Sequence, residues 1–294
     1  MRSANVSSLL LLAVAAASLA ACSAESGRPN QNTSGGTSNV VGPTAGNGTG
    51  GGSAGNGGGS APVTCTAPVA PTTPLRRLTR FEYNNTVRHL AKITDAPANY
   101  FPPEDIGSGF GTDASKQSVG DVQVEKYLTT AKSMAATLTA PARVAELAPC
   151  AVAPAAADEA ACARTVIDTF VPKAFRHPLE AGDADGLAQL FQAVRTGGSS
   201  FQSSLAAVLE AVFQSPEFLY RPELGKPVAD RPDLLRPTDY EMASRLSYLF
   251  YGSMPDEALL AAAAAGQLST NEGVRAQAER MAAIGETTAA LSHS

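Results

Sequence analysis

The stretch "FQSSLAAVLEAVF", residues 201–213, is the clearest indication of how this chain folds. Its apolar positions recur at helical spacing and are Phe201, Leu205, Val208, Leu209 and Val212. Residues three, four and seven apart lie on one face of an α-helix, whereas strand residues alternate with a period of two. The stretch therefore predicts a helix with one buried face.

The same spacing continues on both sides of this stretch. Four helices are predicted before it, with apolar positions at Phe81, Val87, Leu90 and Ala91; at Val124, Leu128, Ala131, Ala135 and Leu138; at Val166 and Phe170; and at Leu187, Leu190, Phe191 and Val194. Gly197 and Gly198 separate the last of these from residues 201–213. A helix with Leu246, Leu249 and Phe250 is predicted after this stretch. We expect an all-α fold of helical bundle modules covering residues 75–140, 141–226 and 237–294.

Several predicted helices begin with recognisable caps. Capping boxes, in which Ser or Thr is followed three residues later by Glu, start at Thr79, Thr238 and Ser269. Ser253 in "SMPDE" offers another N-cap, with Pro255 in the first turn. Alternating apolar and polar strands with hairpin turns are not evident in the sequence, which favours helices throughout.

The N-terminus has the pattern of an export signal. Arg2 precedes an apolar run at 9–21, which is shorter than the roughly 20 residues that a membrane-spanning helix needs. The sequence Leu19-Ala20-Ala21-Cys22 resembles the lipobox of bacterial lipoproteins. That resemblance implies cleavage of residues 1–21 and lipid attachment at Cys22, since two or more acyl chains anchor stably. The alternative is an ordinary signal peptide with a cysteine nearby. Ser23, directly after Cys22, resembles the sorting signal that directs lipoproteins of Gram-negative bacteria to the outer membrane.

Residues 22–74 have the composition of a flexible tether. From Pro29 to Leu75 no residue is charged, and "GNGTGGGSAGNGGGS" at 46–60 has no apolar periodicity. Such a composition does not offset the entropy of ordering. We expect a disordered Gly/Ser/Asn-rich linker with a root-mean-square span of about 35–40 Å.

Composition and cysteines limit the function. The net charge is −5 and no basic stripe appears, so we expect no nucleic-acid partner. The sequence contains no CxxC and no CxxCH motif, so it has neither a thioredoxin-type redox motif nor a c-type haem attachment site. We therefore expect no cofactor. Cys150 and Cys162 bracket an Ala/Pro-rich loop, and we predict that they form a disulfide in an oxidising compartment. Cys65 is left without an assigned partner.

The candidate metal ligands are Glu104, Asp105 and Asp113, which lie in one glycine-rich loop. Calcium takes six to eight oxygen ligands, and this loop lacks the EF-hand spacing, so a solvated acidic loop is the competing interpretation. The same carboxylates are also candidates for the acid/base pair of glycoside cleavage. His89 and His177 have no ligand pattern around them, and we interpret both as structural or solvated.

Several stretches resemble a known family. They are "LRRLTRFEYNNTVRHL" (75–90) with "FPPEDIGSGFG" (101–111), "KAFRHPLEAGDADGLAQLF" (173–191) with "VLEAVFQSPEFLYRPELG" (208–225), and "YEMASRLSYLFYGSMPDEALLAAAAAGQLS" (240–269). In this order they resemble consecutive modules of exported planctomycete and myxobacterial proteins built from domains of unknown function that accompany planctomycete-type cytochromes c. In that family the third module continues beyond the point that corresponds to Ser294, so we interpret it here as truncated. Its apolar positions, which include Leu246, Leu249, Leu259 and Met281, are then expected to be partly exposed.

Two functions are compatible with these features. In the first, the chain is an exported lipoprotein, held in the outer membrane, whose helical body is a non-catalytic binding or scaffold module with a protein partner such as a c-type cytochrome. In the second, it belongs to an extracellular enzyme system that acts on surface polysaccharide. Converging carboxylates in a cleft would favour the second function, and helix faces buried against each other would favour the first.

Overall fold

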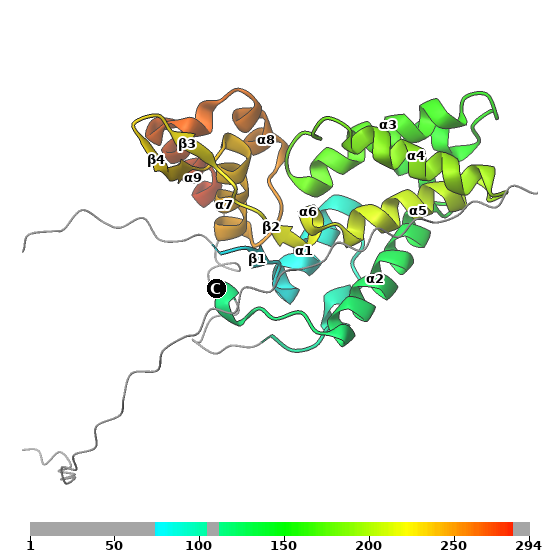
Figure 1. The fold of residues 1–294 in the computed structure, drawn as a ribbon, viewed down its shortest axis with the longest axis horizontal. Helices are drawn as coiled ribbons and strands as arrows, with labels where there is room; N and C mark the ends of the chain where they lie inside the picture. Colours follow the sequence, from blue (N-terminus) through cyan, green and yellow to red (C-terminus); the bar gives the residue numbers. More distant parts are fainter. Residues whose placement is uncertain (1–73, 105–111, 285–294) are drawn as a thin grey trace, which may run out of the picture. The chain divides into compact units, whose positions relative to one another are not determined.

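The computed structural model describes residues 74–104 and 112–284. The predicted signal peptide, Cys22, Cys65, almost all of the tether and Asp105 lie outside the described residues. The elements in chain order (Figure 1) are β1 (Arg76–Arg77), α1 (Arg80–Ala91), η1 (Pro97–Tyr100), η2 (Ala114–Lys116), α2 (Asp121–Thr139), η3 (Val144–Glu146), η4 (Pro149–Val152), α3 (Glu159–Phe175), α4 (Asp183–Thr196), α5 (Phe201–Gln214), α6 (Pro216–Leu219), β2 (Tyr220–Arg221), β3 (Lys226–Val228), β4 (Arg231–Arg236), α7 (Asp239–Tyr251), α8 (Glu257–Ala264), η5 (Gln267–Ser269) and α9 (Asn271–Ala283).

Helix α5 lies at the centre of the first two modules. It packs against both α2 and α4, and α3 packs against α4 in turn (Figure 1). All five apolar positions predicted for it are buried, as expected for a helix with packed neighbours. The stripe predicted on α2 is wrong at its start: Val124 is 56% exposed, and Tyr127 is buried instead. The ring of Tyr127 lies 5.1 Å from that of Phe101 in an edge-to-face arrangement, and the later predicted positions Ala131, Ala135 and Leu138 are buried as expected.

The cap predictions are confirmed at two helices and displaced at two. Complete capping boxes begin α1 at Thr79 and α7 at Thr238. Helix α8 begins at Glu257 with Asp256 as its N-cap, not at Ser253, and Thr270 rather than Ser269 caps α9. In both cases a side-chain oxygen one to three residues further along accepts the hydrogen bond from the first turn: Asp256 from the N–H of Leu259, and Thr270 from the N–H of Gly273.

The expectation of a purely α fold needs one correction, because two small sheets accompany the helices. Strand β1 pairs with β2 in antiparallel register, Arg76 opposite Arg221, and so joins the start of the first module to the end of the second. Strands β3 and β4 form a hairpin between the second and third modules. Strands β1, β2 and β3 are too short to show alternation, and Pro227 in β3 and Pro232 in β4 interrupt the usual strand pattern.

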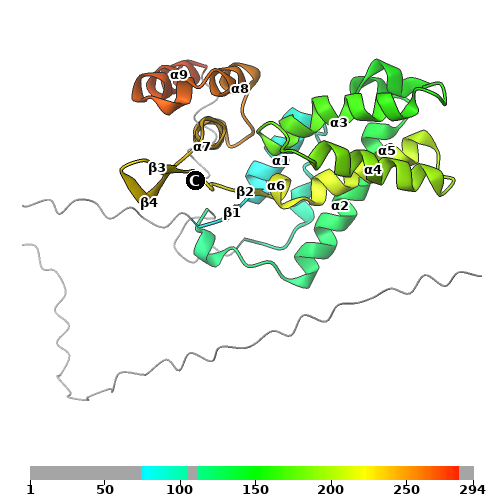
Figure 2. The ribbon, with the colours of Figure 1, turned by 45° about the horizontal axis from the view of Figure 1, so that its top comes forward.

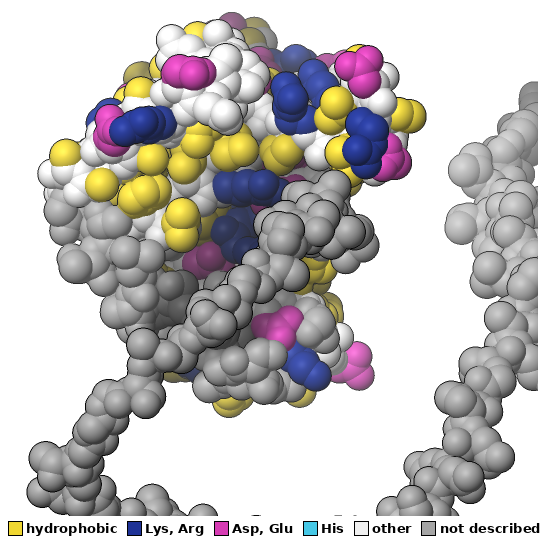
Figure 3. Space-filling view, turned by 90° about the vertical axis from the view of Figure 1, so that its left-hand side faces the viewer, with side chains coloured by type: hydrophobic (Ala, Val, Ile, Leu, Met, Phe, Trp, Pro, Cys, Tyr) yellow, Lys and Arg dark blue, Asp and Glu magenta, His cyan; other side chains and the backbone are white. Residues whose placement is uncertain are grey.

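The third module has a core of its own. Its buried members are Ala243, Leu246, Leu259, Ala262, Ala263, Leu268 and Met281, contributed by α7, α8, η5 and α9. The predicted exposure of this module's apolar stripe is therefore wrong for Leu246, Leu259 and Met281, whereas Leu249 is 54% exposed. Figure 2 shows these helices together at one side of the described chain, and Figure 3 shows hydrophobic side chains gathered in a band across that side. The apolar stripe is thus divided between core and surface.

No helix among the described residues is long and apolar enough to cross a membrane.

Candidate functional site

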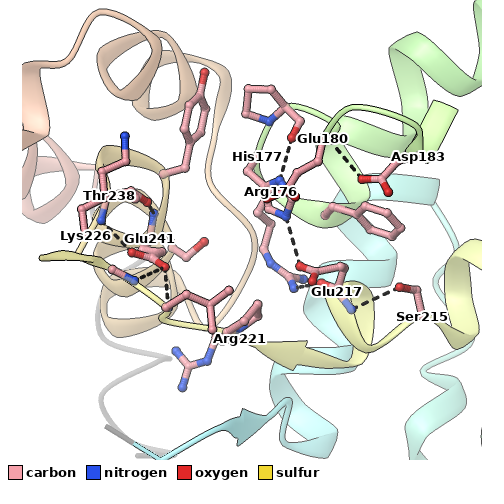
Figure 4. Close-up of a pocket in the computed structure, with 17 residues that line it drawn as sticks. Arg176, His177, Glu180, Asp183, Ser215, Glu217, Arg221, Lys226, Thr238 and Glu241 are labelled. Atoms are coloured by element: carbon pink, nitrogen blue, oxygen red, sulfur yellow. Dashed lines mark hydrogen bonds and ion pairs between the residues drawn. The ribbon is translucent and has the colours of Figure 1, made fainter. Parts of the chain in front are cut away.

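A cleft lies between the second and third modules. Its volume is about 630 Å³, within the range of small-ligand sites, and one wall comes from the ends of α3 and α6 while the other comes from β3 and α7 (Figure 4). The side chains that bear on its chemistry are Arg176, His177, Glu180, Glu217, Lys226, Tyr240 and Glu241.

Arg176 forms the floor of the second-module wall. Helix α3 ends at this residue, whose φ is +67°, and Pro178 follows and cannot continue the helix. The buried guanidinium donates hydrogen bonds to the carbonyl oxygens of Glu217, of Phe218 at 3.2 Å and of Tyr220 at 2.6 Å. Because these backbone acceptors occupy its donors, Arg176 holds α3 and α6 together rather than facing a ligand.

His177 is the polar side chain that follows, and it faces the cleft (Figure 4). Its Nδ1 lies 2.7 Å from the carbonyl oxygen of Pro178, and its Nε2 lies 3.1 Å from a carboxylate oxygen of Glu217. Both ring nitrogens therefore lie within hydrogen-bond distance of an oxygen atom. The cleft thus contains a His177–Glu217 contact in which both side chains are partly exposed.

Glu241 fixes the opposite wall. One oxygen accepts from the backbone N–H of Thr238 at 2.6 Å, and the other accepts from the N–H groups of Leu224 and Gly225 at 2.6 and 3.0 Å. A carboxylate with three backbone donors is a structural anchor, and it holds the chain before β3 against the first turn of α7. Lys226 and Tyr240 on this wall remain the side chains placed to meet a ligand.

The cleft continues into an apolar groove. His177, Pro178 and Tyr240 line both, and the groove has a volume of about 530 Å³ between α3 and α8. Its further walls are mainly Pro172, Leu179, Leu260, Ala261 and Ala264. A site with a charged end and an apolar end suits a ligand that combines an apolar group with charged flanks.

All three modules meet at Tyr248, beside this cleft. Its hydroxyl lies 2.9 Å from the Thr86 hydroxyl of the first module and 3.4 Å from the Arg176 guanidinium of the second. The Arg221 guanidinium lies 4.8 Å from the centre of the Tyr248 ring and pairs with Glu82 at 3.4 Å. Tyr248 is 4% exposed and is the one member of the third module in the core of the first two, among the described residues. We call Tyr248, Thr86, Arg176 and Arg221 the module junction.

The residues predicted from sequence lie elsewhere. Glu104 accepts a hydrogen bond from the backbone N–H of Arg80 and so caps α1, which is a structural role. Asp113 lies before η2, and Asp105 is outside the described residues, so their joint site stays a prediction. No group of three metal-ligating side chains occurs among the residues that the structure describes. His89 bonds to Ser253 at 2.8 Å and links the first module to the third.

The predicted disulfide between Cys150 and Cys162 is present and ties η4 to the first turn of α3. Sequence reasoning missed the cleft, because its walls are joined only by folding. One signal was available: the run Arg176-His177-Pro178 at a helix end places two polar side chains where the chain must turn.

This arrangement defines a mostly helical protein of three successive modules that share one buried polar junction. Comparison with protein families identifies the modules: residues 76–140 match PSD3, protein of unknown function (DUF1587); residues 162–223 match PSD5, protein of unknown function (DUF1595); and residues 238–293 match PSD4, protein of unknown function (DUF1592). No curated protein and no solved structure matches the chain. The resemblance to a multi-module protein of such domains is confirmed, whereas its taxonomic range and its association with cytochromes stay predictions.

Proposed function

We propose that this chain is an exported lipoprotein, anchored in the outer membrane through Cys22, that presents a non-catalytic binding body on a flexible tether. The lipobox and the uncharged Gly-rich segment support the anchor and the tether. The module junction supports a body that holds its shape, because buried hydrogen bonds and a stacked guanidinium connect all three modules.

The observation that carries the binding role is the cleft beside that junction. Arg176 and Glu241 form hydrogen bonds with backbone groups on the two walls of the cleft, so the cleft is preorganised for binding. Lys226, Tyr240 and the His177–Glu217 pair then meet the ligand, and the apolar groove adjoins them. The ligand that fits is a protein segment with an apolar side chain between charged ones, as a c-type cytochrome partner could supply.

The anchor is tested by fractionation. Cys22→Ser should release the protein from the membrane fraction into the soluble periplasmic fraction, because no lipid is then attached. Cys65→Ser is the matched control and should stay with the membrane. Release of both variants, or of neither, would contradict anchoring through Cys22.

The binding role is tested with the full chain carrying Cys22→Ser and a c-type cytochrome from the same organism as the probe. Tyr240→Ala and Lys226→Glu should each weaken binding about tenfold or more, since they remove an aromatic contact and reverse a charge in the cleft. Lys132→Glu, on the exposed side of α2, is the control for charge alone. Equal losses in the control and the cleft variants would show that the cleft is not the site.

A second candidate function is action on surface polysaccharide, because three carboxylates, Glu180, Asp183 and Glu217, line one wall of the cleft. Glycoside cleavage uses two carboxylates, one to protonate the leaving oxygen and one to act as base or nucleophile. Release of reducing ends from purified surface polysaccharide would favour this role if Glu180→Gln and Glu217→Gln abolish it. Binding of that polysaccharide without cleavage would leave the binding role in place.

A further inference from the structure

The β3–β4 hairpin places two cations directly opposite each other. Lys226 on β3 and Arg236 on β4 are register partners in this antiparallel pair. The side chains of such partners leave the same face of a sheet with their Cβ atoms about 4.5–5.5 Å apart, and like charges at that spacing destabilise the pair. Both residues are exposed, and neither forms an ion pair with any residue that the structure describes. We call Lys226 and Arg236 the hairpin cations.

The other sheet of the molecule shows how such a pair is neutralised. It places Arg76 of β1 opposite Arg221 of β2, and there Glu82 pairs with Arg221 at 3.4 Å. Within the described ranges the hairpin has no equivalent of Glu82, because Asp233 on β4 pairs with Arg231 at 2.9 Å. The hairpin cations therefore lack the counter-charge that the first sheet contains.

The remaining carboxylates near the hairpin or outside the described residues are few. Glu241 lies on the same wall of the cleft, but its two oxygens accept hydrogen bonds from three backbone N–H groups. Outside the described residues the chain has three acidic side chains, Glu25, Asp105 and Glu286, and the tether from residue 29 to residue 75 has no charge at all. A carboxylate from another molecule would satisfy the hairpin cations, and the three acidic side chains can be tested directly.

The hairpin cations lie where a ligand in the cleft would pass. Lys226 lines the cleft, as does Leu224, which is 74% exposed, and Figure 4 shows Lys226 on the β3 wall. Arg236 lines a smaller hollow of about 340 Å³ before α9. Tyr240 then joins the cleft to the apolar groove. Resting on the proposed binding role of the cleft, we infer that the partner segment is acidic: a carboxylate binds the hairpin cations, and an apolar side chain of the same segment enters the groove.

The opposite wall of the cleft would attract a basic segment instead, because Glu180, Asp183 and Glu217 line it. Two of these carboxylates already have partners. Glu217 contacts His177 at 3.1 Å, and Asp183 accepts a hydrogen bond from the backbone N–H of Glu180 at 3.0 Å. The hairpin cations have no such partners in the described part of the chain and also repel each other, so charge complementarity favours an acidic segment.

The sign of the charge is tested with three fluorescein-labelled peptides and the full chain carrying Cys22→Ser. The peptides are Glu-Glu-Gly-Ser-Phe-Leu, Gln-Gln-Gly-Ser-Phe-Leu and Lys-Lys-Gly-Ser-Phe-Leu, and fluorescence anisotropy measures their binding. At low salt the acidic peptide should bind about tenfold or more tightly than the other two, and this preference should fall as NaCl rises from about 50 to about 300 mM. Equal affinities, no binding of any peptide, or tighter binding of the basic peptide would overturn the inference.

Variants of the hairpin cations locate the effect. Lys226→Gln and Arg236→Gln should each weaken binding of the acidic peptide about threefold or more, whereas Lys132→Gln, exposed on α2, is the matched control and should not. The double variant Lys226→Glu with Arg236→Glu should reverse the preference, so that the basic peptide binds best. Such a gain of binding cannot result from misfolding. Unchanged affinity for the acidic peptide in both Gln variants would show that the carboxylate binds elsewhere.

Two further variants separate this inference from the proposed function and from an internal counter-charge. Tyr240→Ala should weaken all three peptides equally; if it has no effect while the hairpin variants do, the cleft is not the binding site but the acidic preference stands. A triple variant, Glu25→Gln with Asp105→Asn and Glu286→Gln, should bind the acidic peptide as the wild type does. Binding about tenfold tighter in the triple variant would show that the chain supplies its own counter-charge, and the inference would be wrong.

Discussion

Replacing Tyr248 with Phe removes one oxygen atom from the module junction and leaves the ring in place. The wild-type hydroxyl contacts Thr86 at 2.9 Å and Arg176 at 3.4 Å. Arg176 keeps its bonds to three backbone carbonyls, so it loses little. Thr86 is 0% exposed, and its hydroxyl would be left buried without this partner.

The expected loss follows from that difference. A buried polar group deprived of its partner costs about 1–3 kcal/mol of unfolding free energy. For a body of this size, 1 kcal/mol lowers the melting temperature by about 2–4 °C, so Tyr248→Phe should lower it by about 2–12 °C. Arg221 still stacks on the phenyl ring, and that contribution should be largely retained.

Urea unfolding of four proteins measures the coupling: wild type, Tyr248→Phe, Thr86→Val and the double variant. In the double variant both partners are apolar, so no hydroxyl is stranded. Its loss should be close to that of the larger single variant, not to the sum. Additive losses would refute the junction, because the two hydroxyls would then contribute independently. A Tyr248→Phe variant as stable as the wild type would refute it as well.

Four further results are expected. Gly252→Ala should lower the free energy of unfolding by about 1–3 kcal/mol, because φ is +59° at this position and the new Cβ would lie 2.4 Å from an aromatic carbon of Phe81 in α1. Urea unfolding measures this loss, with Gly120→Ala as a control at a position with open space. Replacing Cys150 and Cys162 together with Ser should cost about 3 kcal/mol for a loop of this length, and a reductant should then leave the variant's melting temperature unchanged. The hydrogen bond and ion pair with Arg195 on α4 lower the pKa of Glu159 below its ordinary value of 4.5. The difference in unfolding free energy between wild type and Glu159→Gln should therefore be largest at neutral pH and should shrink as the pH falls below 4.5. Hydrogen exchange should be earlier in residues 238–284 than in α5, because Tyr248 is the one described side chain of that module that lies in the larger hydrophobic core; equal protection would contradict this.

The helices could be predicted because their causes are local. The buried stripe of α5 and the capping box at Thr79 each depend on residues within a few turns of one another, which a sequence displays directly. The predicted N-cap at Ser253 was wrong for a non-local reason. Its hydroxyl bonds to His89 of the first module, and Asp256, equally suited by sequence, caps α8 instead.

The sites could not be predicted, because distant residues form them. His177 was interpreted as structural or solvated, and its partner Glu217 lies 40 residues away with no motif that links the two. The partner of Arg77 was hidden in the same way, since Tyr127, whose hydroxyl accepts a hydrogen bond from Arg77, lies 50 residues further along the chain. In each case spacing along the chain carries no information about which polar side chains share a cavity.

The pairing of β1 with β2 has a consequence for the order of events during synthesis. The N–H of Leu78 bonds to the carbonyl oxygen of Leu219 at 2.9 Å, and Arg76 pairs with Arg221, so β1 cannot pair until the end of the second module has been made. Loop closure over so many residues is entropically costly and slow. Because a chain emerges from its N-terminus, α1 and α2 are complete long before their closing strand exists. A nascent chain that stops short of Tyr220 therefore exposes the backbone edge of β1, and chaperones that cover such edges have their longest opportunity during that interval.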